Sequence, residues 1–289
     1  MKTHISFRIK LFILFLLLSS PCLLYAQTTP KIEWQKCYGG SGGETVPADG
    51  GRSIIQTSDG GYAFCGYTQS HEGDVSGHHG DSTNVLGDAW VVKINSFGVI
   101  QWQKCLGGTK DDRASCIIQT SDKGYAIAGF TYSTDGDLSK LHVTPGGDAW
   151  IIKLDSLGNI EWQFCFGASI TTQLYDPGYA FSIIQTSNDE YLVAGLELFG
   201  EEGCNNLSVN SANAFILRLD PSGNVIWSGC YGGSGLDDAY SAVQTADSGF
   251  IFAGSTTSND GDVSGYHSDS MNTNTYDSWL VKLNAYGSY

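Results

Sequence analysis

The chain has 289 residues with 37 glycines, 35 aromatic residues and only six prolines, a composition typical of a folded, turn-rich β protein. Its 30 acidic residues outnumber 15 basic ones, and the net charge of −15 repels nucleic acid and acidic lipid. We therefore expect no nucleic-acid partner.

The first predicted element is a secretory signal over residues 1–26. Three basic residues precede the apolar run 11–18, and small residues lead to a cleavage site after Ala26. The run is too short for a membrane anchor, so we expect no transmembrane segment in the mature chain. Cleavage removes three basic residues and no acidic one, which leaves a net charge of −18. These features predict export to the extracellular space, the periplasm or the cell surface.

Cys22 offers an alternative end for this signal, the attachment of a lipid. Lipid signals need a small residue before the cysteine and a leucine three positions before it, whereas Pro21 and Ser19 stand there. Cleavage after Ala26 is the favoured reading, and a lipid anchor stays open as the alternative.

A four-part repeat occupies the rest of the chain. A strand centred on a tryptophan recurs at intervals of 60 to 68 residues, and a Gln-Thr hairpin with Asp-Gly, Asn-Asp or Asp-Ser at its turn follows each copy. An apolar strand that ends in one cation completes the unit. The units span about 31–98, 99–158, 159–223 and 224–289. Each holds about four strands and no helical period.

Two sets of aromatic residues and one set of acids recur at fixed positions of this unit. The first-strand tryptophans are Trp34, Trp102, Trp162 and Trp227. The apolar strand carries Trp90, Trp150 and Trp279, with Phe215 in the third unit, and it is preceded by Asp88, Asp148 and Asp277, with Asn213 in the third unit. Strict recurrence favours core packing for the aromatic rings and structural hydrogen bonds for the acids, because a catalytic residue is normally unique.

Four-stranded repeats with a recurring tryptophan are typical of propeller blades, which bury their faces only against neighbouring blades. Residues 27–289 begin with a tryptophan strand and end just before the next one is due. We therefore predict an all-β fold, a monomeric single-domain β-propeller of four four-stranded antiparallel blades. The N-terminal strand is expected to close the ring by pairing into the last blade.

The sequence also resembles a known kind of repeat. Gly98, Gly158 and Gly223 each stand four residues before a tryptophan, and this spacing resembles quinoprotein-like repeats, in which the tryptophan docks between adjacent blades. The fuller pattern of Trp-Gln-Lys-Cys, Gln-Thr-Ser-Asp-Gly-Gly-Tyr and Asp-Ala-Trp-Val-Val-Lys is similar to secreted or lipid-anchored SBBP-type β-propeller repeats common in Bacteroidetes. The resemblance covers residues 31–289 and implies the propeller architecture, but no activity.

Acidic, glycine-rich loops in three of the units are the weak candidates for a metal site. Their carboxylates, which could act as calcium ligands, are Asp74, Asp135, Asp137, Asp260 and Asp262. The loops lack a full Asp-x-Asp-x-Asp-Gly run and a distal glutamate, so hydrogen-bonded turns are favoured over calcium. No other cofactor is expected.

Histidines and cysteines supply no stronger site. The loop histidines are His71, His78, His79, His142 and His267, and a zinc or copper site would need further ligands from distant loops. Cys37, Cys105, Cys165 and Cys230 share one repeat position, which places them too far apart for mutual disulfides and favours a role as small packing residues.

Three functions remain after these observations. The favoured one is a non-catalytic exported propeller whose loops bind a protein or glycan. The second is an enzyme, or its accessory protein, that acts on polysaccharide, and a unique acidic pair facing the central channel would favour it. The third is a structural envelope module, stiffened by calcium. Known catalytic motifs are missing, so we expect no enzyme. The third unit departs from the pattern at 170–178 and 197–211, as a single binding site would require, and drift in a tolerant loop explains the departure equally well.

Overall fold

The computed structural model describes residues 30–41, 49–80, 86–138, 147–167, 178–198, 212–267 and 275–288. The predicted signal at 1–26 and the unusual segments 170–177 and 199–211 of the third unit lie outside these ranges. Residues 36–289 form one compact unit and residues 1–35 form another. The described residues contain no helix long and apolar enough to cross a membrane.

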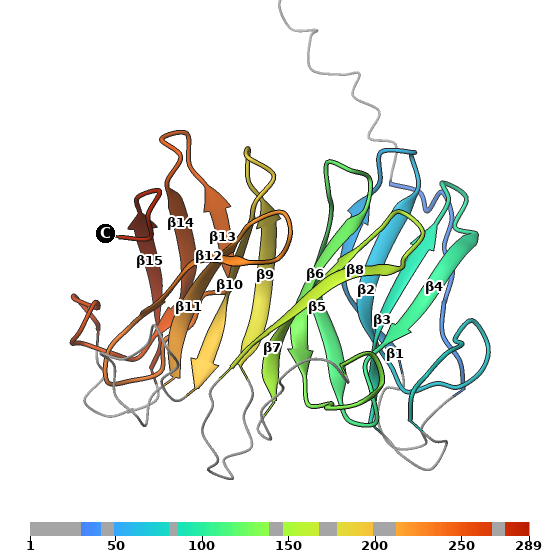
Figure 1. Ribbon diagram of the computed structural model, residues 1–289, viewed down its shortest axis with the longest axis horizontal. Coiled ribbons are helices and arrows are strands. Elements are labelled where there is room, and N and C mark those ends of the chain that lie inside the picture. The colour runs from blue at the N-terminus through green and yellow to red at the C-terminus, as the bar shows by residue number, and fades with distance from the viewer. Residues whose placement is uncertain are drawn as a thin grey trace, which may run out of the picture. The chain divides into compact units, whose positions relative to one another are not determined.

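The described part of residues 36–289 forms 15 strands in four antiparallel sheets, which follow one another in chain order (Figure 1). The first sheet contains β1 (Asp49–Gln56), β2 (Tyr62–Thr68), β3 (Asp88–Ile94) and β4 (Ile100–Leu106). The second contains β5 (Asp112–Gln119), β6 (Tyr125–Thr131), β7 (Asp148–Leu154) and β8 (Ile160–Phe166). The third contains β9 (Tyr179–Gln185), β10 (Tyr191–Leu198), β11 (Ala212–Leu219) and β12 (Val225–Tyr231). The fourth contains β13 (Ser241–Gln244), β14 (Phe250–Thr256) and β15 (Asp277–Leu283). The predicted all-β class and the repeat of small antiparallel sheets are confirmed.

The first hairpin of each sheet turns where the sequence indicated, although Lys123 of the second sheet is not in one of the predicted residue pairs. Gly60, Lys123, Asp189 and Ser248 have φ angles of 81°, 71°, 62° and 62°, the left-handed conformation that such tight turns require. The turns therefore fix the register between the first two strands of every sheet.

Successive sheets pack against each other through apolar clusters. One face of the first sheet, with Val91, meets Trp150 of the second sheet, and the pattern repeats where Ile151 meets Phe215. Ile216 of the third sheet meets Trp279 of the fourth in the same way. The second set of aromatic residues, Trp90, Trp150, Phe215 and Trp279, is buried. Alternation along each strand thus supplies one face for each neighbouring sheet.

Three tryptophans of the first set, Trp102, Trp162 and Trp227, dock on the turn of the following sheet, whereas Trp34 is 38% exposed. A Cβ atom added to Gly158 would lie 3.0 Å from the Trp102 ring, and one added to Gly223 would lie 2.8 Å from the Trp162 ring. Gly287 and Trp227 repeat this contact at 2.9 Å. Each of these glycines has a left-handed φ angle. Only glycine combines that backbone with room for the indole ring.

The structure differs from the predicted ring at its ends. The fourth sheet has three strands, and residues 30–41 contain no strand, so the predicted fourth strand of the last blade is not in place. A strand needs a neighbour for its backbone hydrogen bonds, and the sequence of the first tryptophan segment cannot specify which edge it joins. The four sheets are shown, and ring closure is not.

We predict that alanine at Gly223 destabilises the fold by more than the backbone cost alone. Gly60 provides the matched control, because its φ of 81° is close to the 84° of Gly223 but open space surrounds its Cβ position. Gly60→Ala should lower the free energy of unfolding by about 1 kcal/mol. Gly223→Ala should cost a further ~1 to 3 kcal/mol, since the new methyl group overlaps the Trp162 ring. Chemical denaturation measures both values, and equal losses in the two variants would contradict tryptophan docking.

Candidate functional site

One carboxylate in each of three units, buried in two of them and half-buried in the first, ties the first hairpin of a sheet to the strand end that precedes it. Asp112 accepts hydrogen bonds from the Gly108 amide at 2.8 Å, the Ser133 hydroxyl at 2.7 Å and the Thr131 hydroxyl. Asp49 and Asp237 have the corresponding donors in the first and fourth units. Burial raises the pKa of Asp112 to about 6, although its hydrogen bonds oppose the shift.

The five candidate calcium ligands also bind backbone amides. Asp74, Asp137 and Asp262 accept from the amides of Gly39, Gly107 and Gly232 at 3.2, 3.1 and 3.1 Å. Asp135 and Asp260 accept from the amides of Thr109 and Ser234 at 2.8 and 2.7 Å. Among the described residues, no group of three or more histidine, cysteine, aspartate or glutamate side chains is arranged to hold a metal ion. Through these hydrogen bonds, the carboxylates connect each loop to the residues that follow the preceding tryptophan segment.

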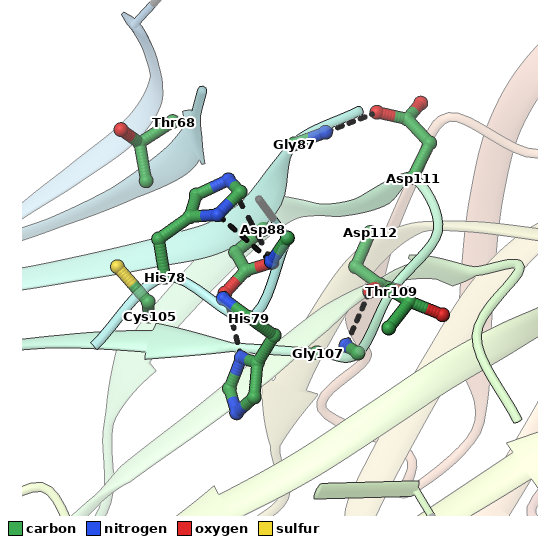
Figure 2. Close-up of polar contacts among 12 residues, drawn as sticks. Thr68, His78, His79, Gly87, Asp88, Cys105, Gly107, Thr109, Asp111 and Asp112 are labelled. Carbon is green, nitrogen blue, oxygen red and sulfur yellow. Dashed lines mark hydrogen bonds and ion pairs between the residues drawn. The ribbon is translucent and has the colours of Figure 1, made fainter. Parts of the chain in front are cut away.

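Histidines surround Asp88, which is buried at the start of β3 (Figure 2). The Asp88 carboxylate lies 2.7 Å from Nδ1 of His79 and also accepts the His79 backbone amide at 3.0 Å. Nε2 of the same ring lies 3.6 Å from Asp137 of the second unit. Burial alone would lower the pKa of His79, but Asp88 and Asp137 outweigh it and raise the pKa above its usual value. His79 therefore connects the first and second units.

His78 lies on the other side of Asp88. Its Nδ1 accepts the Gly80 amide at 3.0 Å, which assigns the proton of the neutral ring to Nε2, 3.9 Å from Asp88. The ring also packs 4.2 Å from that of His71, measured between ring centroids. Both contacts are with residues of the same loop, so the buried His78 side chain has a structural role in that loop.

The histidine contact recurs in the fourth unit and is therefore part of the repeat. His267 Nδ1 lies 2.9 Å from Asp277, which also accepts the His267 amide at 2.7 Å. Asp148 and Asn213 are buried at the equivalent position in the second and third units. His142 lies outside the described residues. Sequence reasoning missed the pairing, although a histidine nine or ten residues before the Asp-x-Trp strand was the available signal.

The third unit supplies its buried carboxylate from the opposite strand. Gly178 stands where the second unit has Asp112, and Glu197 stands where it has Thr131. A Cβ added to Gly178 would lie 2.5 Å from Glu197 Oε2, so the glutamate carboxylate fills the space beside this glycine. Glu197 is itself buried. A departure that looked like loop drift is thus a compensated exchange.

A cleft of about 440 Å³ lies between the third and fourth sheets, and none of its aromatic residues belongs to the repeated sets. It is lined by Tyr179, Leu196, Ala212, Leu236, Asp237, Asp238, Tyr240, Ser255 and Tyr276. Tyr240 and Tyr276 are 54% and 56% exposed. Burial, followed by the hydrogen bond and charge of Asp238, raises the pKa of Tyr240.

The cleft occupies positions at which the repeat varies. Tyr179 of β9 pairs with Leu196, whereas the equivalent pair in the second sheet is Arg113 with Phe130, and the first sheet has Gly50 with Tyr67. The strands themselves keep their register, so the scaffold is common and the lining is specific. The cleft, rather than the set of repeated acids, is the candidate functional site.

Cysteine chemistry separates one residue from its repeat partners. Cys230 is in a disulfide, while Cys37, Cys65, Cys105, Cys116 and Cys165 are free. Burial raises the pKa of Cys105 to about 12. A thiol with so high a pKa is a poor nucleophile.

No protein-family model matches the chain, and no curated protein matches it. Among solved structures, a protein of unknown function from Bacteroides caccae is similar, with a TM-score of 0.35 and 10% identity over 70% of this chain. The match spans about half, 52%, of that structure's length.

If the third unit is given the residues that the second unit has at positions 178 and 197, the effects of the two substitutions on stability should be strongly coupled. Glu197→Thr leaves no carboxylate in the site, and Gly178→Asp places a second carboxylate beside the first. Each single change should cost about 2 kcal/mol or more, because a buried polar group loses its partner or meets a like charge. The double variant should recover at least ~1 kcal/mol, measured by a denaturation cycle.

The reverse exchange in the second unit, Asp112→Gly with Thr131→Glu, is the matched control. It should show coupling of the same sign, because the two units share one backbone register. Additive losses in both cycles would contradict the exchange.

Proposed function

We propose that the chain is an exported, non-catalytic β-propeller with four blades that presents one binding site for a glycan or protein. The observation that carries this proposal is the cleft at Tyr179, Tyr240 and Tyr276, a concave surface whose three aromatic residues are not part of the repeat. Single sites on symmetric scaffolds need such a departure, and exposed aromatic rings are frequent in binding surfaces. The resemblance to SBBP-type repeats is part of the proposal.

Export is supported by two features. The signal pattern of residues 1–26 is typical of secreted chains, and the disulfide at Cys230 fits an oxidising compartment. Both fit the cell surface, the periplasm or the extracellular space.

The outer faces of the first and last sheets support ring closure. Leu280 of β15 is 64% exposed, although its equivalents Val91, Ile151 and Ile216 are buried against the next sheet. Ile54 of β1 is 65% exposed, although its equivalent Ile117 is buried against the previous sheet. Each end therefore presents the surface that the other end lacks, and closure would bury both.

The contacts of residues 38–40 support the same conclusion. Gly39 and Gly40 donate to Asp74 and Asp49, as Gly107 and Gly108 at the end of β4 donate to Asp137 and Asp112. Residues 38–40 thus lie against the first sheet as the end of a preceding tryptophan strand would. The register of β3 with β4, in which Val91 faces Lys104, then predicts that Leu280 faces Lys36 in a closed ring.

Closure predicts a disulfide between Lys36→Cys and Leu280→Cys within one chain. The pair is introduced with Cys37→Ser, which removes the neighbouring exposed thiol, and mild oxidation is followed by mass spectrometry of the monomeric fraction. Paired strands place such Cβ atoms about 4.5 to 5.5 Å apart, close to the distance a disulfide needs. Lys36→Cys with Val243→Cys, on the exposed β13, is the control and should stay unlinked. A link found only between two chains would contradict closure.

Binding is favoured over hydrolysis because the protein's own hydrogen bonds hold both carboxylates of the cleft. Asp237 accepts from Gly233, Thr256 and Ser258, and Asp238 accepts from the amide and the hydroxyl of Ser255. Glycoside hydrolysis normally uses two carboxylates with separate roles. The cleft therefore suits recognition.

The function is tested with the exported chain and isolated polysaccharide and protein fractions of the producing cell's envelope. We expect saturable binding of one fraction, a loss of at least about tenfold in affinity for Tyr240→Ala with Tyr276→Ala, and no change in the size of the bound material. Surface plasmon resonance measures binding, and chromatography of the ligand detects cleavage. Shortened polysaccharide chains would favour the enzyme alternative, and binding unaffected by the double variant would remove the cleft from the function.

A further inference from the structure

We propose that the cleft between the third and fourth sheets binds a neutral oligosaccharide. This inference rests on the proposed binding function and specifies its ligand. The cleft combines aromatic rings, hydroxyl groups and the carboxylates of Asp237 and Asp238. The flat face of a sugar ring packs on aromatic rings, and the hydroxyl groups on its edge bond to the polar groups.

The two exposed aromatic side chains of the site lie just before strands of the fourth sheet. Tyr240 and Tyr276 extend from the start of the fourth sheet's first hairpin and from the residue before β15, and more than half of each side chain is open to solvent. The rigid tyrosine side chain offers a large contact area at low entropy cost, and its hydroxyl remains hydrated. The apolar face of a pyranose ring can cover such rings without burying an unpaired polar atom.

The polar part of the site is held in place by the backbone. Asp238 accepts from the Ser255 amide at 2.6 Å and from the Ser255 hydroxyl at 2.9 Å, one bond to each carboxylate oxygen. The Tyr240 side chain also hydrogen-bonds to Asp238, which uses part of the remaining acceptor capacity within the cleft. A carboxylate fixed in this way offers an acceptor to one hydroxyl group of a sugar.

The aromatic surface continues beyond the cleft. Tyr240 lies 5.2 Å from Phe181, Phe181 lies 5.9 Å from Tyr179, and Tyr179 lies 4.8 Å from Phe130, between ring centroids. Phe130 belongs to β6, so the rings extend from the fourth sheet to the second. Such a length fits several linked sugar units better than one.

Charge and lining exclude the other common ligands. The chain carries a net charge of −15 and the cleft holds Asp237 and Asp238, which disfavours uronic acid chains, sulfated glycans and nucleotides. Ser255, the tyrosine hydroxyls and the carboxylates line too polar a surface for a lipid or steroid, since their desolvation would not be repaid. A basic peptide is the remaining competitor, because tyrosine rings and a carboxylate also attract cations.

The test uses the full exported chain and isothermal titration calorimetry with three probes. These are hexamers of neutral hexoses in several linkages, an oligouronate of the same length, and a lysine-rich decapeptide. We expect binding of at least one neutral hexamer and none of the oligouronate. Tyr276→Ala and Asp238→Asn should each weaken it by about tenfold.

Tyr286→Ala, which removes an even more exposed tyrosine from outside the cleft, is the matched control and should stay within about twofold. Binding of the decapeptide alone, lost in Tyr276→Ala, would overturn the sugar assignment and leave the proposed binding function standing. Hexamer binding that Tyr276→Ala and Asp238→Asn do not alter would overturn the site. Binding of none of the probes would overturn the inference, while the envelope-fraction assay would still decide the broader function.

Discussion

The structure depends on one interaction, in which a carboxylate at the start of a sheet accepts the amide of a glycine that follows the preceding tryptophan segment, seen at three such segments. Asp112 takes the Gly108 amide in this way, and Asp137 takes the neighbouring Gly107 amide. A buried amide without an acceptor costs a large part of a domain's net stability, so each sheet needs the next to complete it. Apolar packing and tryptophan docking then stabilise the same interface between successive sheets. The units are therefore stacked in one order.

Much of this fold could be predicted from the sequence because the repeat displays it four times. Turn residues such as Gly60 and Asp189 mark the hairpins, and the Gly-x-x-x-Trp spacing indicates the docking of Trp102 and Trp162. Closure could not be decided in the same way. Residues 32–38 have the sequence of a tryptophan strand, but the sequence pattern is the same whether that strand joins β15, another chain or no edge at all.

The candidate site was harder to predict for a physical reason. Repetition makes structural residues conspicuous, and it directed attention to the acids of the loops, which serve backbone amides. The cleft residues Tyr179, Asp238 and Tyr240 are visible only once strand register shows which positions are equivalent. The His79 contact with Asp88 was hidden similarly, because the loop between them varies in length from unit to unit.

The exchange of Gly178 and Glu197 has a consequence for how this gene can change. Tandem copies of similar sequence invite recombination between units, which deletes or duplicates a repeat. A crossover inside the hairpin, between the position of Gly178 and that of Glu197, would join the start of one unit to the end of another. With the third unit as a parent, the hybrid carries either no carboxylate in the buried site or two that repel each other. A crossover at the turn between two units takes both positions from one parent and therefore leaves the carboxylate of the buried site in place.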